Sequence, residues 1–216
     1  MVNLIIRVNK MTKTIIFDFD GTLANTRQVL LKVYPRVARK YNFKILPEEE
    51  LEKLKSLSFR ERFKKVDMPI AKLPAIIRET RALCSEYMDL CEPYPGIPET
   101  VYSLADRGYF LAIISSNIED NIKQFLTSQN MEVFDSIFTT SGFFGKHTVL
   151  AKFLKKQGIN KDNVIYVGDE VRDIVSCRKV GIKVISVTWG YDDVSILEQA
   201  GPDYLVNEPA EILNYF

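Results

Sequence analysis

The sequence predicts an α/β fold in which a parallel sheet carries helices on both faces and an α-helical cap domain is inserted after the first strand. From about residue 99 onward, short apolar runs of strand length alternate with helical patterns, which favours a parallel sheet covered on both sides. Between residues 26 and 90, Lys, Arg, Glu and Leu dominate at helical spacing and no clear strand run appears. We therefore predict a core of residues 1–23 and 94–216 and a cap of residues 24–93.

Composition and charge exclude several classes of protein. Hydrophobic residues make up 46% of the 216-residue chain and charged residues 26%, which is ordinary for a globular domain in water. The formal net charge of +1 gives no electrostatic reason to bind nucleic acid or an anionic membrane surface. The longest apolar runs, such as residues 110–114, are far shorter than the ~20 residues that span a bilayer. We expect no nucleic-acid partner, no membrane partner and a cytoplasmic location.

Two further features agree with a cytoplasmic protein. Residues 1–8 are apolar, but Arg7 interrupts them and the run is too short for a secretory signal. Met11, close before the first strand, is an alternative start that would make residues 1–10 an extension. The three cysteines form no C-x-x-C pair, which favours reduced, buried thiols: Cys84, Cys91 and Cys177.

The first predicted strand ends in two carboxylates. Residues 15–17 are apolar and rich in β-branching, and Asp18 and Asp20 follow before a Gly21-Thr22 turn. In an extended chain, residues i and i+2 point the same way, so both carboxylates are expected to face the end of the sheet. Two close carboxylates repel each other unless a cation or a shared proton compensates. The pair therefore indicates a Mg²⁺ site or a nucleophile beside an acid, although solvated acids in an Asp-Gly turn give the same pattern.

The insert shows three apolar stripes at helical spacing. The first recurs at every fourth residue: Val29, Val33, Val37 and Tyr41. A second stripe consists of Leu51, Leu54 and Leu57, and a third helix beyond Pro69 and Pro74 carries Ile76, Ile77, Leu83 and Tyr87. Residues 93–98, rich in proline, end the insert with a rigid turn.

The second half of the chain alternates helices and strands. Helices are predicted at residues 99–107, 148–157 and 195–200, and around the apolar stripes Ile118-Ile122-Phe125-Leu126 and Ile174-Cys177-Val180. Gly108, Gly158 and Gly181 are suitable residues to end three of these helices. Strands are predicted at residues 110–114, 136–139, 164–167 and 184–187, with an edge strand at 205–206.

Polar residues gather where the predicted strands end. Parallel α/β sheets bind ligands outside the carboxyl ends of their strands, so these residues are the candidates for chemistry. They form four clusters: Asp18 with Asp20, Ser115-Ser116-Asn117, the loop of residues 139–146, and Asp169-Glu170 with Asp173.

The four clusters resemble the four motifs of the haloacid dehalogenase-like superfamily, in order and at compatible spacing, from about Lys13 to Asn207. The Asp18-Phe-Asp-Gly-Thr-Leu signature is the most specific part, and the motif from Gly168 to Asp173 is the next. The chain looks most similar to the phosphoglycolate-phosphatase-like subgroup with a small helical cap. The resemblance implies a Rossmann-like parallel sheet, a Mg²⁺-dependent phosphatase activity, a small phosphomonoester substrate and a monomer.

The resemblance also implies roles for the catalytic residues. Asp18 would attack phosphorus and become an aspartyl phosphate, and Asp20 would protonate the leaving group and then deprotonate water. Ser115, or less favourably Ser116, would donate a hydrogen bond to a phosphate oxygen, and Lys146 would neutralise charge. His147, next to Lys146, is interpreted as a bystander.

Metal and substrate residues follow from the same resemblance. The Mg²⁺ ligands would be Asp18, the main-chain carbonyl of Asp20 and Asp169, with Asp173 beside them holding waters or the lysine. Substrate binding is predicted for Thr22, Ser116, Asn117 and Arg60. Arg60 lies in the cap and could meet an anionic leaving group, with Arg62 and Arg27 as alternatives.

Three other activities remain open at this point. A phosphomutase would use the same aspartyl phosphate and return it to a sugar. A binding protein on a retired catalytic fold would lack a motif residue, and none is missing. A dehalogenase is disfavoured, because dehalogenase members of the family lack the aspartate found here at Asp20.

Overall fold

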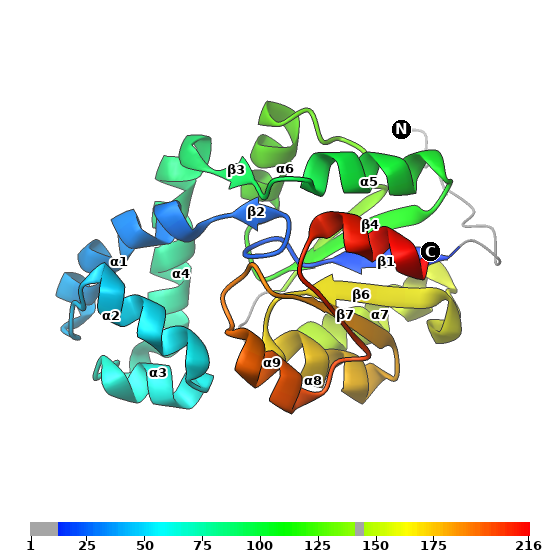
Figure 1. The fold of residues 1–216 in the computed structure, drawn as a ribbon. Helices are drawn as coiled ribbons and strands as arrows, with labels where there is room; N and C mark the ends of the chain where they lie inside the picture. Colours follow the sequence, from blue (N-terminus) through cyan, green and yellow to red (C-terminus); the bar gives the residue numbers. More distant parts are fainter. Residues whose placement is uncertain (1–12, 141–144) are drawn as a thin grey trace.

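The structure is a computed structural model and describes residues 13–140 and 145–216 (Figure 1). Six parallel strands form one sheet in the order β5-β4-β1-β6-β7-β8. Their bounds are β1 Thr14–Phe17, β4 Phe110–Ser115, β5 Ser136–Thr139, β6 Val164–Gly168, β7 Lys183–Val187 and β8 Tyr204–Val206. The predicted parallel α/β sheet is confirmed, and β1 lies at its centre with β4 and β6 as neighbours.

Helices cover both faces of the sheet, as predicted (Figure 1). One face carries α5 (Ile97–Asp106), α6 (Glu119–Ser128) and the 3₁₀ segment η5 (Pro209–Tyr215). The other carries α7 (Lys146–Gln157), α8 (Val171–Val180) and α9 (Val194–Ala200), with the short η4 (Lys161–Asn163) before β6.

Side-chain alternation in β1 builds two separate apolar cores. Ile15 and Phe17 belong to the cluster that includes α5 and α6, whereas Ile16 packs with α7 and α8. All three side chains are fully buried. The central strand is therefore apolar on both faces, which is the pattern expected of a doubly covered parallel sheet.

The insert is a group of short helices beside the carboxyl ends of the strands. Its α-helices are α1 (Arg27–Tyr41), α2 (Glu48–Lys53), α3 (Phe59–Lys65) and α4 (Leu73–Cys84), with 3₁₀ segments η1 (Leu54–Ser56), η2 (Ile70–Lys72) and η3 (Ser85–Leu90). At its base, β2 (Ala24–Asn25) and β3 (Glu92–Pro93) pair antiparallel. The sequence did not predict these two strands, because two residues are too few to show a periodicity. The division into two domains at residues 24 and 93 stays a prediction.

Several predicted elements differ in detail from the structure. The Leu51-Leu54-Leu57 stripe is not one helix, because α2 ends at Lys53 and Leu57 is extended. Ile118 is 39% exposed at the N-cap of α6, so it is not part of the buried stripe. Helix α7 begins at Lys146, two residues earlier than predicted. Residues 1–10, and residues 141–144 of the 139–146 loop, lie outside the described residues.

Several polar contacts join the insert to the core, and two of them involve Arg62 and Ser85. Arg62 of α3 forms an ion pair with Asp192, which follows β7, and Asp192 also accepts the main-chain N–H of Val171 at 2.7 Å. Ser85 of the insert donates to Asn121 of α6 at 2.7 Å. These contacts hold the insert against the sheet in the arrangement seen in Figure 1.

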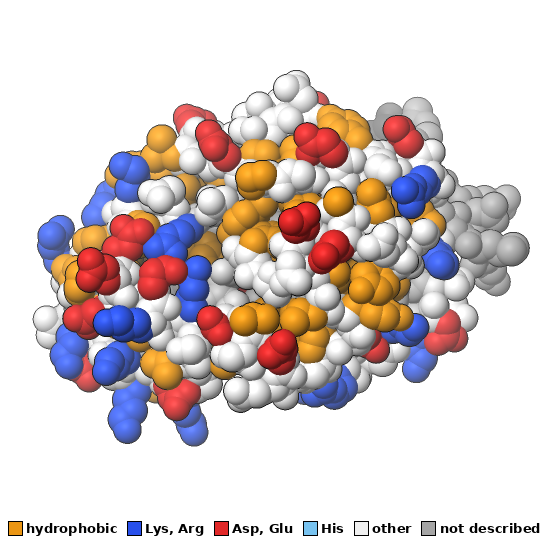
Figure 2. Space-filling model, in the orientation of Figure 1, with side chains coloured by type: hydrophobic (Ala, Val, Ile, Leu, Met, Phe, Trp, Pro, Cys, Tyr) orange, Lys and Arg blue, Asp and Glu red, His pale blue; other side chains and the backbone are white. Residues whose placement is uncertain are grey.

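The surface of the insert carries both signs of charge, and the cysteine thiols are buried. Figure 2 shows Lys and Arg side chains interspersed with Asp and Glu over the insert, so positive and negative charges are mixed on this face. The three cysteines are free and buried, as predicted. Within residues 13–140 and 145–216, no helix combines the length and the apolar character needed to cross a bilayer.

The centre of the sheet should be sensitive to a loss of side-chain volume. Ile113 of β4 is fully buried, and Ile70 of η2 is 60% exposed. We expect Ile113→Ala to lower the free energy of unfolding by about 2–5 kcal/mol, because it removes buried methyl groups and leaves a cavity. Ile70→Ala should change it by less than about 0.5 kcal/mol. Urea unfolding of both variants checks this, and equal losses would contradict the described core.

Candidate active site

The loop after β1 places Asp18 and Asp20 at the end of the sheet. The N–H of Asp18 donates to Val167 of β6 at 2.8 Å and prolongs the strand pairing by one residue. The chain then turns around the carbonyl of Phe19, which accepts the N–H groups of Leu23 and Ala24 at 3.0 Å. The two carboxylates face the same cavity, as predicted, but a turn rather than strand alternation brings them there.

Asp169, at the end of β6, sits in a cradle made by two loops. Its Oδ1 accepts the Thr22 hydroxyl at 2.8 Å, and its Oδ2 accepts the N–H of Tyr191 at 2.8 Å. A Cβ at Gly21 or Gly190 would overlap the Asp169 side chain. Gly21 also has a φ of +79°, a conformation that other residues rarely adopt. The Asp-Gly-Thr sequence after β1 is thus explained by the close approach of Asp169.

Asp20 is held by Asn117, which follows β4. The Asn117 side-chain amide donates to the two Asp20 oxygens at 2.9 and 3.2 Å. Burial raises the pKa of the Asp20 carboxyl, and hydrogen bonds from Thr26 and Asn117 oppose this rise. The hydroxyl of Ser115 accepts the N–H of Asn117 at 3.0 Å, which leaves its own proton available for another acceptor. Ser115 is fully buried, and Ser116 lines the cavity.

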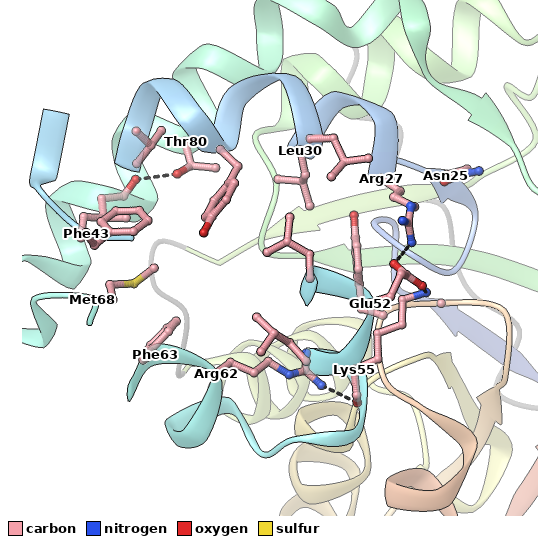
Figure 3. A pocket seen from close by; sticks show the side chains of 18 of the residues that line it. Asn25, Arg27, Leu30, Phe43, Glu52, Lys55, Arg62, Phe63, Met68 and Thr80 are labelled. Atoms are coloured by element: carbon pink, nitrogen blue, oxygen red, sulfur yellow. Dashed lines mark hydrogen bonds and ion pairs between the residues drawn. The ribbon is translucent and has the colours of Figure 1, made fainter. Parts of the chain in front are cut away.

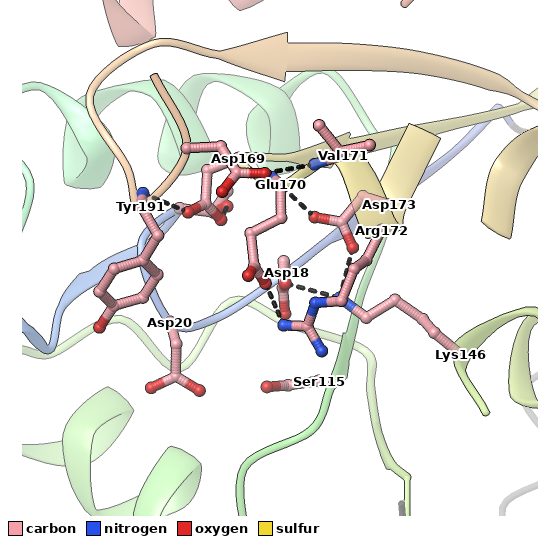
Figure 4. A network of polar contacts seen from close by, with 12 residues as sticks. Asp18, Asp20, Ser115, Lys146, Asp169, Glu170, Val171, Arg172, Asp173 and Tyr191 are labelled. Atoms are coloured by element: carbon pink, nitrogen blue, oxygen red, sulfur yellow. Dashed lines mark hydrogen bonds and ion pairs between the residues drawn. The ribbon is translucent and has the colours of Figure 1, made fainter. Parts of the chain in front are cut away.

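Lys146 joins two carboxylates, one in the loop after β1 and one on helix α8 (Figure 4). Its ammonium donates to Asp18 Oδ2 at 2.6 Å and to Asp173 Oδ1 at 2.5 Å. Burial acts to lower the pKa of Lys146, but Asp173 and Asp18 outweigh it, so the pKa is raised and the lysine stays charged. The second oxygen of Asp173 accepts the N–H of Glu170 at 3.2 Å. Asp173 therefore positions the lysine, which is one of the two roles predicted for it.

The acidic groups outnumber the cationic groups around Asp18. In Figure 4, five carboxylates share the network with the cations Lys146 and Arg172: Asp18, Asp20, Asp169, Glu170 and Asp173. Burial raises the pKa of Asp18 and, aided by neighbouring carboxylates, raises that of Asp169 well above its usual value. It also raises the pKa of Asp173 to about 6, against the effect of Lys146. Burial likewise acts to raise the pKa of Glu170, but the Arg172 guanidinium outweighs it and lowers that pKa.

This shortage of positive charge fits a divalent cation. Asp18, Glu170 and Asp173 are buried and offer carboxylate oxygens that all lie within 4.8 Å of one another. Hard divalent cations such as Mg²⁺ prefer such all-oxygen surroundings. The group differs from the predicted ligand set, because Glu170 joins it and Asp169 is turned into its cradle. Asp169 directly precedes Glu170 in the sequence and stays a predicted ligand.

Asp18, Asp20 and Glu170 line a cavity between the core and the insert, which we call the inner cavity. Its volume is about 330 Å³, which is sufficient for a small metabolite. Asp18, Asp20, Ser116 and Asn117 line its core side. Apolar side chains of the insert line the opposite side, including Phe59, Phe63, Met68, Leu73 and Ile76.

A second cavity, the insert cavity, adjoins the inner cavity and has a volume of about 490 Å³. Figure 3 shows Leu30, Phe43, Phe63 and Met68 among the residues around it. Glu52 lines the insert cavity, but the five carboxylates of the site around Asp18 do not. The inner cavity is therefore where chemistry is possible, and the insert cavity borders it through shared residues such as Leu30 and Phe63.

Two predicted substrate residues take other places in the structure. Thr22 is fully buried and its hydroxyl is bonded to Asp169, so it positions that carboxylate instead of facing the inner cavity. Arg60 is exposed on α3 and lines neither the inner cavity nor the insert cavity. Helix α3 presents Arg62 to the core and Arg60 to solvent. The structure therefore does not support the prediction that Arg60 binds the substrate.

Three polar residues near the site were not predicted. Asp192 pairs with Arg62, Arg172 pairs with Glu170, and Arg81 of α4 lines the inner cavity. Arg172 stands inside the Gly168–Asp173 motif, so its place in the sequence could have indicated it. Arg81 lies in α4 with two other charged residues, Arg78 and Glu79, and only the packing of the insert shows which of them faces inward.

Comparisons with known proteins agree on one family. The family model of the haloacid dehalogenase-like hydrolases matches residues 15–187. A phosphoglycolate phosphatase of Synechococcus elongatus is 27% identical over 202 residues, which cover 93% of this chain and 95% of that protein. The pyrophosphatase PpaX of Bacillus mycoides is 26% identical over 206 residues, covering 93% and 94%.

Solved structures show the same fold. A haloacid dehalogenase-like family hydrolase, SP0104 from Streptococcus pneumoniae, superposes with a TM-score of 0.80 at 19% identity, covering 95% of this chain and 98% of that one. A protein described as a predicted phosphatase from Clostridium acetobutylicum gives a TM-score of 0.80 at 24% identity, covering 93% and 96%.

Lys146 should matter for stability because it compensates buried carboxylates. We expect Lys146→Met to lower the free energy of unfolding by about 3–5 kcal/mol, since it leaves Asp18 and Asp173 without their cation. Lys152→Met is the matched control, because Lys152 is exposed on the same helix. Urea unfolding in the presence of a chelator checks this, so that no added cation replaces the lysine. Equal stabilities of the two variants would contradict the described network.

Proposed function

The chain belongs to the haloacid dehalogenase-like hydrolase family, and we propose that it is a Mg²⁺-dependent phosphatase of a small phosphorylated metabolite, a phosphoglycolate-like phosphomonoester. One observation carries this proposal. Asp18, paired with Lys146 at 2.6 Å, and Asp20, bonded to Asn117, line the same 330 Å³ cavity. A nucleophile and a separate acid beside it are the groups that covalent phosphoryl transfer requires.

In the first step, an Asp18 oxygen attacks the phosphorus of the substrate. Lys146 donates to the Asp18 carboxylate and so opposes the rise of its pKa, and the Ser115 hydroxyl has a proton to donate to a phosphoryl oxygen. The bond between phosphorus and the leaving oxygen breaks as Asp20 gives that oxygen a proton. The raised pKa of Asp20 supports its role as the protonated acid.

In the second step, water releases the phosphate. Asp20, now ionised, removes a proton from a water molecule that attacks the phosphorus of the aspartyl phosphate. The bond between Asp18 and phosphorus breaks, and inorganic phosphate and the original carboxylate result. The apolar side chains of the insert would exclude other water during the first step, which protects the acyl phosphate.

Mg²⁺ would be held at the acidic end of the inner cavity. The ligands we propose are Asp18, Asp169 and the main-chain carbonyl of Asp20, with Glu170 nearby. When bound, the cation would neutralise the charge of the phosphoryl group and favour its approach to Asp18. Asp173 keeps Lys146 in place, because its Oδ1 accepts the ammonium at 2.5 Å while its Oδ2 accepts the N–H of Glu170.

Pyrophosphate hydrolysis is a second candidate, because relatives named pyrophosphatase PpaX match this chain over nearly its whole length. The chemistry at Asp18 would be the same, and only the leaving group would differ. A panel of 2-phosphoglycolate, pyrophosphate and sugar phosphates separates these activities. For the phosphomonoesters, one phosphate released per substrate lost supports a phosphatase, whereas an isomerised sugar phosphate without release supports a phosphomutase. Hydrolysis of pyrophosphate releases two phosphates per molecule.

Removal of the nucleophile should abolish turnover while the fold survives. We expect Asp18→Asn to lower kcat for 4-nitrophenyl phosphate by about 10⁴-fold or more. The matched control is Asp106→Asn, because Asp106 is exposed at the end of α5. Mass spectrometry of the acid-quenched wild-type enzyme should find a phosphoryl group on the Asp18 peptide. Turnover by folded Asp18→Asn protein would contradict the covalent mechanism.

Metal removal should be reversible and selective. A chelator should abolish phosphate release, and added Mg²⁺ should restore it, because buried carboxylates need a divalent counter-charge. Ca²⁺ should restore much less, since it is larger and accepts irregular coordination. Activity that persists in chelator would argue against the metal site, and equal restoration by Ca²⁺ would argue against Mg²⁺ selectivity.

A further inference from the structure

The two sides of the inner cavity differ in chemistry. The core side carries the reacting groups, whereas the insert side is mainly apolar. Arg81, on α4, lines the insert side next to Ile77 and Cys84, and the helix packs against α1. A guanidinium in an apolar wall is stabilised by a nearby anion, because it carries a permanent positive charge and only hydrogen-bond donors.

The other charged side chains that line this cavity already have partners in the described part of the chain. The pairs are Asp18 with Lys146, Asp20 with Asn117, Glu170 with Arg172, and Arg62 with Asp192. Arg81 differs from them. Its Nη2 atom is buried, and none of the described residues provides an acceptor for it. A buried donor without an acceptor is unfavourable, so its persistence in a cavity points to a ligand.

Arg81 and Asp20, the proposed acid, line the same inner cavity. Burial lowers the pKa of its guanidinium, and Asp20 is the carboxylate that acts in the opposite direction. In the proposed function, Asp20 protonates the leaving oxygen. The phosphoryl group itself would lie toward Lys146 and Ser115, which belong to the core. Arg81 therefore faces the part of the substrate beyond the ester oxygen.

Resting on the proposed function, we propose that Arg81 binds a second anionic group, a carboxylate or a phosphate, that the leaving group carries close to the ester oxygen. The planar guanidinium can form two parallel hydrogen bonds to either group. The surrounding apolar wall strengthens this interaction, because it removes competing water. Arg81 is thus a specificity residue that selects phosphorylated hydroxy acids or pyrophosphate over esters with uncharged leaving groups.

The test compares two substrates of nearly equal size. The leaving group of 2-phosphoglycolate ends in a carboxylate, and that of 2-hydroxyethyl phosphate ends in a hydroxymethyl group. Pyrophosphate forms a third arm, which distinguishes a phosphate from a carboxylate at Arg81. Dissociation constants are measured by calorimetry with Mg²⁺ in an Asp18→Asn background, where turnover does not interfere. The values of kcat/KM are measured separately with Asp18 intact.

The variants are Arg81→Met, Arg81→Lys and the control Arg78→Met. Methionine keeps an unbranched apolar side chain but removes the charge, and Arg78 is exposed on the same helix. With Arg81 present, 2-phosphoglycolate or pyrophosphate should bind about 10- to 100-fold more tightly than 2-hydroxyethyl phosphate. Arg81→Met should reduce this preference to less than about threefold, and Arg81→Lys should retain part of it. Arg78→Met should leave it unchanged.

Two results would overturn the inference. One is an equal loss of binding for all three compounds in Arg81→Met, which would place Arg81 on the transferred phosphoryl group or in the fold. The other is a preference that Arg81→Met leaves intact. Failure of the proposed function looks different, because the protein with Asp18 intact would then release no phosphate from any compound. The dissociation constants test Arg81 in that case as well.

Discussion

The structure depends on how it compensates the negative charge buried around Asp18. Ionised carboxylates are costly to bury unless each finds a cation or a donor. Lys146 bridges Asp18 and Asp173, Arg172 pairs with Glu170, and Asn117 holds Asp20. The compensation is incomplete, since the pKa values of Asp18 and Asp169 are still raised. The remaining negative charge is what makes a divalent cation favourable at this place.

The backbone around the site is arranged to bring these groups together. Asp169 approaches the loops after β1 and β7 so closely that glycine is required at residues 21 and 190. Thr22 and the N–H of Tyr191 then fix the two oxygens of Asp169. The strand order places β1 between β4 and β6, so the loops that carry Asp18, Ser115 and Asp169 are neighbours. Fold and chemistry are therefore coupled through the central strand.

The core and the insert contribute different things to the site. The core supplies the groups proposed to react, and it holds them through short hydrogen bonds between buried atoms. The insert supplies an apolar wall and the guanidinium of Arg81, and it is fixed to the core by Arg62 and Ser85. Substrate preference can therefore change through residues of the insert while the phosphoryl chemistry in the core stays the same.

The sequence by itself determined the strands of the parallel sheet, most helices and the four polar clusters, because strand and helix periodicities and glycine turns are local properties of the chain. Through the family resemblance it also gave Asp173 two alternative roles, holding waters or holding Lys146, and the structure shows the contact with Lys146. Only the tertiary structure decided that Thr22 serves Asp169, and that Arg81 faces the inner cavity while Arg60 faces solvent. Both arginines lie on helices of the insert that carry other charged side chains, Arg60 on α3 and Arg81 on α4. Which of them points inward depends on how α3 and α4 pack against the core, and periodicity does not encode that packing.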